Sequence, residues 1–305
     1  IKEDLNIIAA GSFKMHKNSW MFLTHNDSDF DGITYDTSVE KNKIKDVLSL
    51  IFDSLNERVI FNKISQEDAV FKELNLLCLP DKKLFIFPYT VCPILRCNNG
   101  EMIFPHFNNK KIRYYENRLN KKGDCGFFVY EELEDMDNWI MHFVNMHKKL
   151  WDGKRRPNSK FHDTKIISKL RSDLTAWAKD EVLVRYGLKL DGEYISMVIG
   201  LKSGKSIIYH SIAYNPDYAK YSPGIATLRF IGRWMDANKY HELDFGIGNE
   251  SYKYSFSNFE SQLYKIIIVN RNDYIGLLIS FVERFVRKRP FLLKLYRLIK
   301  KRINI

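Results

Sequence analysis

The feature that most constrains the fold is a β-rich segment, a polar turn and a helical segment that follow one another in the second half of the chain. Residues 205–213 predict a strand, and residues 215–220 predict a polar turn. Residues 221–224, Tyr-Ser-Pro-Gly, open a helix that extends to about Ala237, because Ser suits a helix cap and Pro suits the first helical turn.

The start of this predicted helix has the chemistry of a diphosphate site. The first backbone amides of a helix lack intrahelical acceptors, and the helix dipole adds partial positive charge there. Gly224 lets a ligand approach the backbone closely, so a diphosphate can lie on the amides of Gly224, Ile225 and Ala226. The alternative interpretation is that Ser-Pro-Gly serves only as a favourable helix start.

Short strands and helices alternate along the whole chain, which predicts a mixed α/β (α+β) protein. In the second half, Asp191-Gly192 is a hairpin turn signal between two strands, and a strand at 240–245 leads into a glycine-rich turn at 246–248. We expect a domain boundary near residue 155.

The first half contains two less regular signals. Ser65 and Asp68 form a capping-box arrangement, which predicts a helix that starts at Ser65. Pro88 and Pro93 interrupt the β-rich residues 83–97, which predicts two strands or an edge strand there.

The positive charge is concentrated at one end of the chain. The expected parts are an N-terminal domain (1–155), a second domain (156–280) and a basic C-terminal helix (281–305). This last segment holds nine basic residues and one acidic residue, which supply +8 of the formal net charge of +11. The rest of the chain is only weakly basic, which argues against a nucleic-acid partner.

The cysteines predict neither a metal site nor disulfides. Cys78, Cys92, Cys97 and Cys125 form no CxxC pair, and no nearby His pair completes a zinc pattern. We expect buried free thiols in a reducing cytoplasm and no bound metal. The longest apolar run, residues 274–282, is too short for a bilayer span, which needs about 20 residues. We expect no signal peptide.

Several short motifs cluster between residues 177 and 256. They are Tyr221-Ser222-Pro223-Gly224, Trp234, Leu243-Asp244-Phe245-Gly246, Gly248-Asn249-Glu250, and Tyr252-Lys253 with Phe256. Upstream, His147 and Trp151 form a His-plus-aromatic element. With these motifs the chain resembles the GNAT-superfamily acetyltransferases first labelled as cellulose-biosynthesis proteins.

The resemblance implies a bilobal protein of two GNAT-like domains, as in the Fem peptidyltransferases. Each domain would be a mixed, mostly antiparallel sheet flanked by helices. It also implies acyl-CoA as co-substrate, held by Ile212, Ala213, Tyr214, Ser222, Gly224, Ile225 and Ala226. GNAT enzymes usually keep a Gln/Arg-x-x-Gly-x-Gly/Ala loop here. Only Gly224, Ile225 and Ala226 match its last three positions, a departure that weakens the expected phosphate affinity.

Acyl transfer from a thioester to an amine needs a proton acceptor and oxyanion donors, but no covalent nucleophile. Asp244, at the end of a predicted strand, is the first candidate for the base, and an Asx turn is its alternative role. His210 and Glu250 are further candidates, with alternatives as a structural His and as a partner of Lys253. Expected acceptor-binding residues are Tyr252, Lys253, Trp151 and Arg113, for which surface packing or a solvated helix face is the alternative.

We therefore expect transfer of an acyl group from CoA to the amine of an amino sugar, in nucleotide-linked form, for bacterial surface polysaccharides. A second enzyme interpretation is Fem-like transfer from aminoacyl-tRNA. A third, without catalysis, takes residues 281–305 as a membrane-surface or partner-docking helix. The alternative for that segment is a helix packed on the protein with its charges outward. The oligomeric state stays open.

Overall fold

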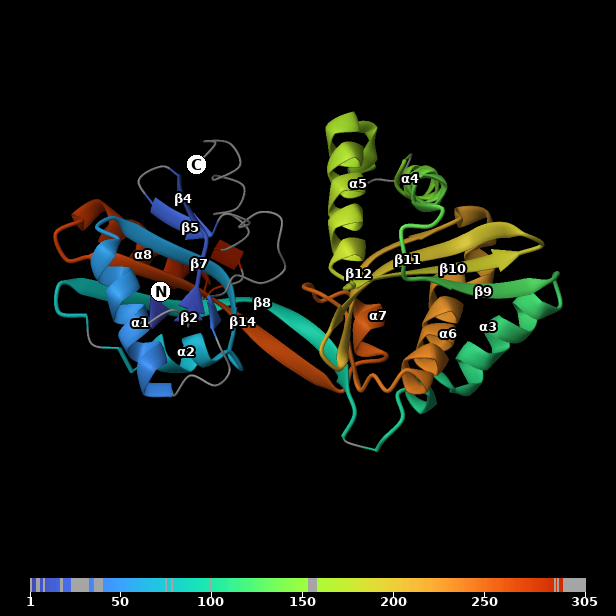
Figure 1. The fold of residues 1–305 in the computed structure, drawn as a ribbon, viewed down its shortest axis with the longest axis horizontal. Helices are drawn as coiled ribbons and strands as arrows, with labels where there is room; N and C mark the ends of the chain where they lie inside the picture. The colour runs from blue at the N-terminus through green and yellow to red at the C-terminus, as the bar shows by residue number, and fades with distance from the viewer. Residues whose placement is uncertain are drawn as a thin grey trace. The chain divides into compact units, whose positions relative to one another are not determined.

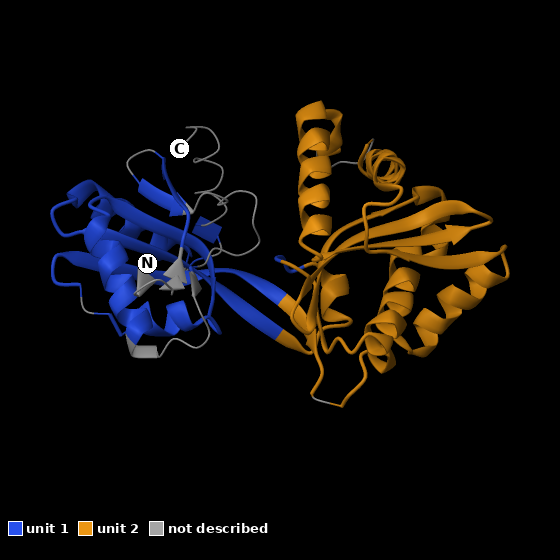
Figure 2. Ribbon diagram, viewed as in Figure 1, with its two compact units in different colours: residues 1–92, 247–249, 260–305 blue, residues 93–246, 250–259 orange. Residues whose placement is uncertain are grey.

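The structure is a computed structural model, and it describes residues 2–3, 6–7, 9–16, 19–22, 33–35, 41–74, 76–77, 79–98, 100–152, 158–287, 289 and 291–292. The chain divides into two compact units (Figure 2). Unit 1 comprises residues 1–92, 247–249 and 260–305, and unit 2 comprises residues 93–246 and 250–259.

This division differs from the predicted boundary near residue 155. Strand β9 (Cys125–Tyr130) precedes that boundary, yet it pairs antiparallel with β10 (Leu183–Leu190), with Cys125 opposite Leu190. Residues from the expected N-terminal domain therefore complete the sheet of unit 2. In turn, strand β14 (Phe259–Asn270) pairs with β7 (Arg58–Ser65) inside unit 1. Pairing between strands far apart in sequence sets the units, and local composition does not report it.

Unit 2 is built on one sheet with the strand order β8-β13-β12-β11-β10-β9. Its pairs are antiparallel except for the parallel pair of β12 and β13. Besides β9, β10 and the end of β8 (Lys82–Arg96), it contains η1 (Phe104–Phe107), α3 (Lys110–Asn120), α4 (Met136–Trp151), η2 (Lys160–His162), α5 (Thr164–Lys179), β11 (Glu193–Ser203), β12 (Ser206–Tyr214), η3 (Pro216–Tyr221), α6 (Pro223–Ala237), β13 (Glu242–Asp244) and α7 (Ser251–Tyr254).

Helices cover both faces of this sheet (Figure 1). On one face, α3 and α6 bury residues such as Ile112, Leu228 and Ile231 against the strands. On the other face, α4 and α5 bury Trp139 and Leu174. The sheet is therefore apolar on both sides, and the burial of these side chains supplies most of the drive for folding.

The hairpin predicted at Asp191-Gly192 is confirmed. Asp191 and Gly192 have φ values of 50° and 82°, and they join β10 to β11. Positive φ at both central residues gives a turn whose twist matches that of the paired strands, which favours Asp-Gly here.

Unit 1 contains the strands β4-β5-β7-β14-β8 in that order, and β8 links them to the strands of unit 2 in one ten-stranded sheet. Helices α1 and α2 pack on one face through Leu48, Phe52 and Val70, and α8 lies against the other face, where Leu277 meets Phe85 and Phe87. Besides β7, β8 and β14, its elements are β1 (Lys2–Glu3), β2 (Asn6–Ile7), β3 (Ala9–Ala10), β4 (Phe13–His16), β5 (Ser19–Phe22), β6 (Thr34–Tyr35), α1 (Lys41–Ser54), α2 (Ala69–Leu74) and α8 (Tyr274–Arg287). Both units are thus mixed, mostly antiparallel sheets with helices on them, which confirms the predicted fold class.

Two local predictions in unit 1 are wrong. Residues 82–96 form the single strand β8, although Pro88 and Pro93 lie inside it. Helix α2 starts at Ala69 and not at Ser65, because Ser65 is the last residue of β7 and Asp68 accepts the amide of Val70 at 2.8 Å. Side-chain caps compete with strand pairing for the same residues, and here the pairing of β7 prevails.

Three of the four cysteines, Cys92, Cys97 and Cys125, are free thiols, and Cys78 lies outside the described residues. Among the helices of the described residues, none is long and apolar enough to cross a membrane.

Candidate functional site

The main irregularity of unit 2 is the early end of β13 beside β12. The two strands pair only at Ser206, Ile207 and Ile208 of β12, opposite residues 242–244. Strand β12 continues to Tyr214, so its residues 209–214 run beyond the last β13 pair. Over residues 209–214, the backbone groups on this edge of β12 are therefore not paired with β13 and are available to another partner.

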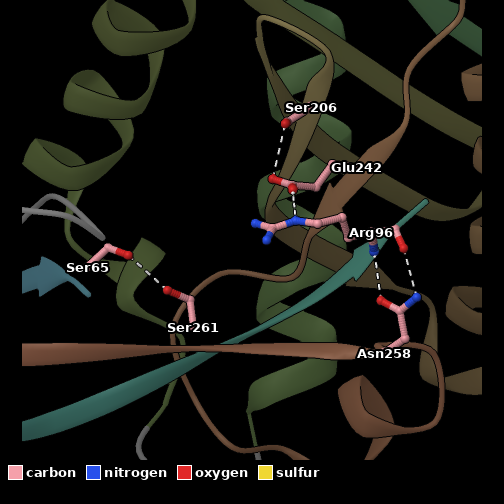
Figure 3. A network of polar contacts seen from close by, with 6 residues as sticks. All are labelled: Ser65, Arg96, Ser206, Glu242, Asn258 and Ser261. Atoms are coloured by element: carbon pink, nitrogen blue, oxygen red, sulfur yellow. Dashed lines mark hydrogen bonds and ion pairs between the residues drawn. The ribbon is translucent and has the colours of Figure 1, made fainter. Parts of the chain in front are cut away.

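A group of polar side chains holds β13 in place before the two strands part (Figure 3). Glu242 accepts a hydrogen bond from the Ser206 hydroxyl at 3.1 Å and pairs with Nε of Arg96 at 2.6 Å. Asn258 bonds both backbone groups of Arg96, accepting from the amide at 2.9 Å and donating to the carbonyl at 2.7 Å. These contacts join β12, β13 and β8 at one end, which fixes where the strands diverge. The other contact drawn in Figure 3, Ser65 with Ser261 at 2.9 Å, belongs to unit 1.

The start of α6 lies directly after β12 and η3, as predicted, but its amides differ from the prediction. Ser222 is at the N-cap with a left-handed φ of 48°, and its side chain makes no capping hydrogen bond. Its carbonyl accepts the amides of both Ile225 and Ala226 at 3.0 Å. The expectation that three amides are free is therefore wrong for two of them. Of these three amides, only that of Gly224 has no hydrogen-bond acceptor among the described residues.

A pocket of about 230 Å³ lies between the divergent end of β12, the start of α6 and α7. Its lining residues are Tyr209, Ile212, Tyr214, Ala219, Ser222, Pro223, Gly224, Ile225, Leu228 and Tyr252. The structure thus brings together six of the residues singled out from the sequence. The wall is mainly apolar, with hydroxyl groups from Ser222 and three tyrosines. A thioester and its acyl group fit such a surface better than a charged group does.

Two tyrosines of this pocket, the buried Tyr209 and the half-buried Tyr252, are proton donors at neutral pH. Burial raises the pKa of Tyr252 to about 12, with a smaller contribution from the carboxylate of Glu250. Burial likewise raises the pKa of Tyr209 well above its ordinary value, and the neighbouring Tyr252 adds to this. Both phenols therefore keep their protons and can donate to a developing negative charge. Tyr209 was not identified from the sequence, although its alternation with His210 along β12 would have assigned the two to opposite faces.

The three candidate bases do not line the pocket. Asp244 is buried, and its Oδ1 accepts the Gly246 amide at 2.7 Å in the Asx turn that was its alternative role. Glu250 pairs with Lys253 at 3.0 Å. Burial of Glu250 favours its neutral form, but the hydrogen bond and charge of Lys253 and a backbone hydrogen bond together outweigh this and lower the pKa of the carboxyl. Lys253 is itself buried and also donates to the Gly246 carbonyl at 3.2 Å.

His210 and Ala213 point away from the pocket. The His210 ring is exposed and meets Trp177 of α5 edge-on, with ring centroids 5.4 Å apart. Ala213 packs in the core beneath α4 and α5. Ala226 lies in another core cluster, next to Leu119. For both alanines only the backbone remains as a possible contact to a ligand.

The predicted acceptor-binding residues outside the motif region are scattered. Trp151 stacks on His147 in α4, with ring centroids 5.7 Å apart, and Arg113 is exposed on α3. Another arginine of α3 does reach the turn before α6. Arg118 donates to the carbonyl of Lys220 at 3.0 Å, and its guanidinium lies 4.8 Å from the centroid of the Tyr221 ring. Positive charge at this turn thus comes from Arg118 and Lys220.

No cluster of three or more His, Cys, Asp or Glu side chains that could hold a metal ion occurs among the described residues.

The region that contains the pocket matches a known protein family. Residues 107–254 match the acetyltransferase (GNAT) domain family. No curated protein sequence matches the chain. Residues 107–254 are therefore similar to a GNAT acetyltransferase domain, which supports an acyltransferase activity.

Solved structures show that the fold extends over both units. The structure of FemX has 11% sequence identity with this chain and a TM-score of 0.61, and the match covers 92% of this chain and 89% of FemX. The structure of L-PGS from Bacillus licheniformis has 13% sequence identity with this chain and a TM-score of 0.58, and the match covers 91% of this chain and 86% of L-PGS. A conserved protein of unknown function from Bacteroides thetaiotaomicron has 9% sequence identity and a TM-score of 0.51, and the match covers 83% of this chain and 79% of that protein. At these identities the likeness concerns the fold alone.

Proposed function

We propose that unit 2 transfers an acyl group from acyl-CoA to the nitrogen of an amine. The observation that carries the proposal is the divergence of β12 from β13 beside a pocket at the start of α6. A strand edge with available backbone groups suits the amides of a pantetheine arm, and a helix start suits a diphosphate. GNAT domains use acyl-CoA in general, and the match over residues 107–254 includes every residue of the pocket.

The residues present fit this co-substrate in part. The Gly224 amide and the Ser222 hydroxyl are the hydrogen-bond donors at the helix start, and Arg118 and Lys220 supply positive charge at the same turn. The edge of β12 near Ile212, Ala213 and Tyr214 would hold the pantetheine arm. Because one backbone amide donates fewer hydrogen bonds than three, binding of the diphosphate depends more on the positive charges of Arg118 and Lys220.

The chemistry assigned to the pocket is addition of a neutral amine to the thioester carbonyl, followed by loss of the thiolate. The Tyr252 hydroxyl, with its raised pKa, would donate its hydrogen bond to the departing sulfur. The pocket lining contains neither a carboxylate nor an imidazole. The amine proton therefore leaves through water, and Asp244, His210 and Glu250 have positions that suit structural roles.

For the acceptor we propose an amino sugar, in nucleotide-linked form. This rests on the motifs shared with the cellulose-biosynthesis-like acetyltransferases, which run from Tyr221 to Phe256. The second candidate is transfer from an aminoacyl-tRNA, favoured by the likeness of the fold to FemX over 92% of the chain. A C-terminal helix that contacts a membrane is compatible with either reaction.

The test is thiol release from acetyl-CoA in the presence of amine acceptors, followed with a thiol-reactive dye. Nucleotide-linked amino sugars, free amino sugars and simple amines form the acceptor panel. Thiol release that depends on the enzyme, on the acceptor and on acetyl-CoA would support the proposal, and detection of an amide product by mass spectrometry would identify the acceptor. If no amine accelerates release, while tRNA binds with a steep salt dependence, the second candidate replaces the first.

A further inference from the structure

The helix α8 packs on unit 1 through Leu277 and a face of small and polar residues. Gly276, Ser280 and Glu283 are its buried residues, at the spacing of one helical face. Both carboxylate oxygens of Glu283 accept hydrogen bonds from Lys265 of β14 at 2.8 Å, and Arg287 pairs with the same carboxylate at 3.0 Å. The Glu283 ion pairs and Leu277 thus hold this helix, whereas a helix usually docks by its wide apolar stripe.

Most of the other large apolar side chains of α8 consequently face outward. Leu278 is 63% exposed and Phe281 is 60% exposed. The exposed stripe consists of Tyr274, Ile275, Leu278, Ile279, Phe281, Val282 and Phe285. The alternative for residues 281–305 is a helix packed on the protein with its charges outward. Most of that segment lies outside the described residues, but in the part within α8 the side chains of Phe281, Val282 and Phe285 are exposed. A contiguous apolar stripe on the surface of a protein usually marks an interaction site.

The charge near the stripe indicates what covers it. Arg284 and Arg289 are exposed, and the guanidinium of Arg289 lies 3.8 Å from the centroid of the Phe285 ring. Glu283, the one acidic residue among residues 281–305, is buried and its charge is neutralised by Lys265 and Arg287. The sequence beyond α8 adds Lys288, Lys294, Arg297, Lys300, Lys301 and Arg302. A second copy of the chain would bring the same charges against each other, whereas an anionic surface complements them.

We propose that the apolar stripe of α8 docks on an anionic lipid surface. The helix lies in the plane of the surface with its apolar side chains at the boundary of headgroups and acyl chains, and the basic residues bind the lipid charges. The proposal does not depend on acyl transfer, because the stripe belongs to unit 1 and the pocket belongs to unit 2.

The experiment is co-sedimentation of the full chain with vesicles of phosphatidylcholine alone and of phosphatidylcholine mixed with phosphatidylglycerol. The wild type is expected to bind the anionic vesicles and to lose affinity as salt rises. Leu278→Ser combined with Phe281→Ser should weaken the partition at least about tenfold, because both side chains lose their apolar insertion. Leu50→Ser is the matched control, since Leu50 is 61% exposed on α1 of the same unit, and it should leave binding unchanged.

Several outcomes would overturn the proposal. One is that wild-type protein stays in the supernatant with anionic vesicles, and another is that the double variant binds as tightly as the wild type. A third is a wild-type dimer in sedimentation velocity that the double variant dissolves, which would make a second copy the occupant. Near-ultraviolet circular dichroism and the thermal midpoint should match the wild type for all variants, because each substituted side chain is exposed.

Discussion

The substitution Gly224→Ala should weaken the binding of acyl-CoA without lowering the stability of the protein. A Cβ at this position would lie 2.9 Å from Cδ1 of Ile212, and its next nearest neighbour, Cδ1 of Tyr214, would be 3.9 Å away. The Ile212 atom ends a flexible side chain and can move by the few tenths of an ångström required. Ala favours a helix over Gly by up to about 1 kcal/mol, so the free energy of unfolding should stay the same or rise slightly.

Binding of acyl-CoA should respond in the opposite direction. The added methyl group occupies the lining of the pocket next to the Gly224 amide, where the proposed diphosphate approaches. Loss of one hydrogen bond to a charged group costs about 1.5–3 kcal/mol, which corresponds to a Kd about 10- to 100-fold weaker.

Isothermal calorimetry with acetyl-CoA and thermal unfolding of the same samples measure the two effects. Thr164→Ala is the control, because Thr164 is an exposed residue in the first turn of α5 and lies outside the pocket. A Gly224→Ala variant that binds acetyl-CoA like the wild type would refute the placement of the diphosphate. A clear fall in its thermal midpoint would refute the packing argument.

Three further substitutions test other parts of the structure. Tyr252→Phe should lower kcat at least about tenfold with unchanged stability, and wild-type activity should not fall through this group up to about pH 10, since its pKa is raised to about 12; a pH–rate series checks both. Asp244→Asn can keep the Asx bond and should retain kcat within about threefold, whereas a true base would lose activity, and Asp244→Ala should cost about 1–3 kcal/mol in denaturant unfolding. Burial acts to raise the pKa of Glu283, but Lys265 and Arg287 outweigh it and lower the pKa, so this stabilisation is present above about pH 4.5 and is lost as the pH falls through the folded pKa. Glu283→Gln should therefore destabilise the protein by about 3–5 kcal/mol at neutral pH and flatten the acid limb of a stability–pH curve.

The strongest local patterns of the sequence agree with the structure. Helix α6 runs from Pro223 to Ala237, and the Asp-Gly turn joins β10 to β11. Both depend on residues adjacent in sequence, so propensity and turn chemistry report them directly.

Features set by distant residues could not be predicted in this way. The prolines of β8 suggested a break, but pairing with β14 and β13 keeps the strand continuous. The stripe of α8 was visible as a pattern, yet periodicity shows only which residues share a face and not which face meets the protein. That choice depends on Lys265, which β14 brings to Glu283.

The candidate site shows the same division. The turn at Ser222 and Gly224 was recognisable because its residues are consecutive. The contribution of Tyr209 requires knowledge of which face of β12 meets α6, and the contact of Arg118 with the carbonyl of Lys220 joins two distant segments. Asp244 met the chemical criteria for a base, but its hydrogen bond to the Gly246 amide is a matter of local geometry.

The discontinuous course of the chain through its two units has a consequence for synthesis on the ribosome. All of unit 2 has been translated once residue 259 is made, whereas unit 1 still lacks β14, which belongs between β7 and β8. We therefore expect unit 2 to fold first. Until β14 is made, the strands of unit 1 that are already translated have unpaired edges, which exposes them to chaperones and to aggregation.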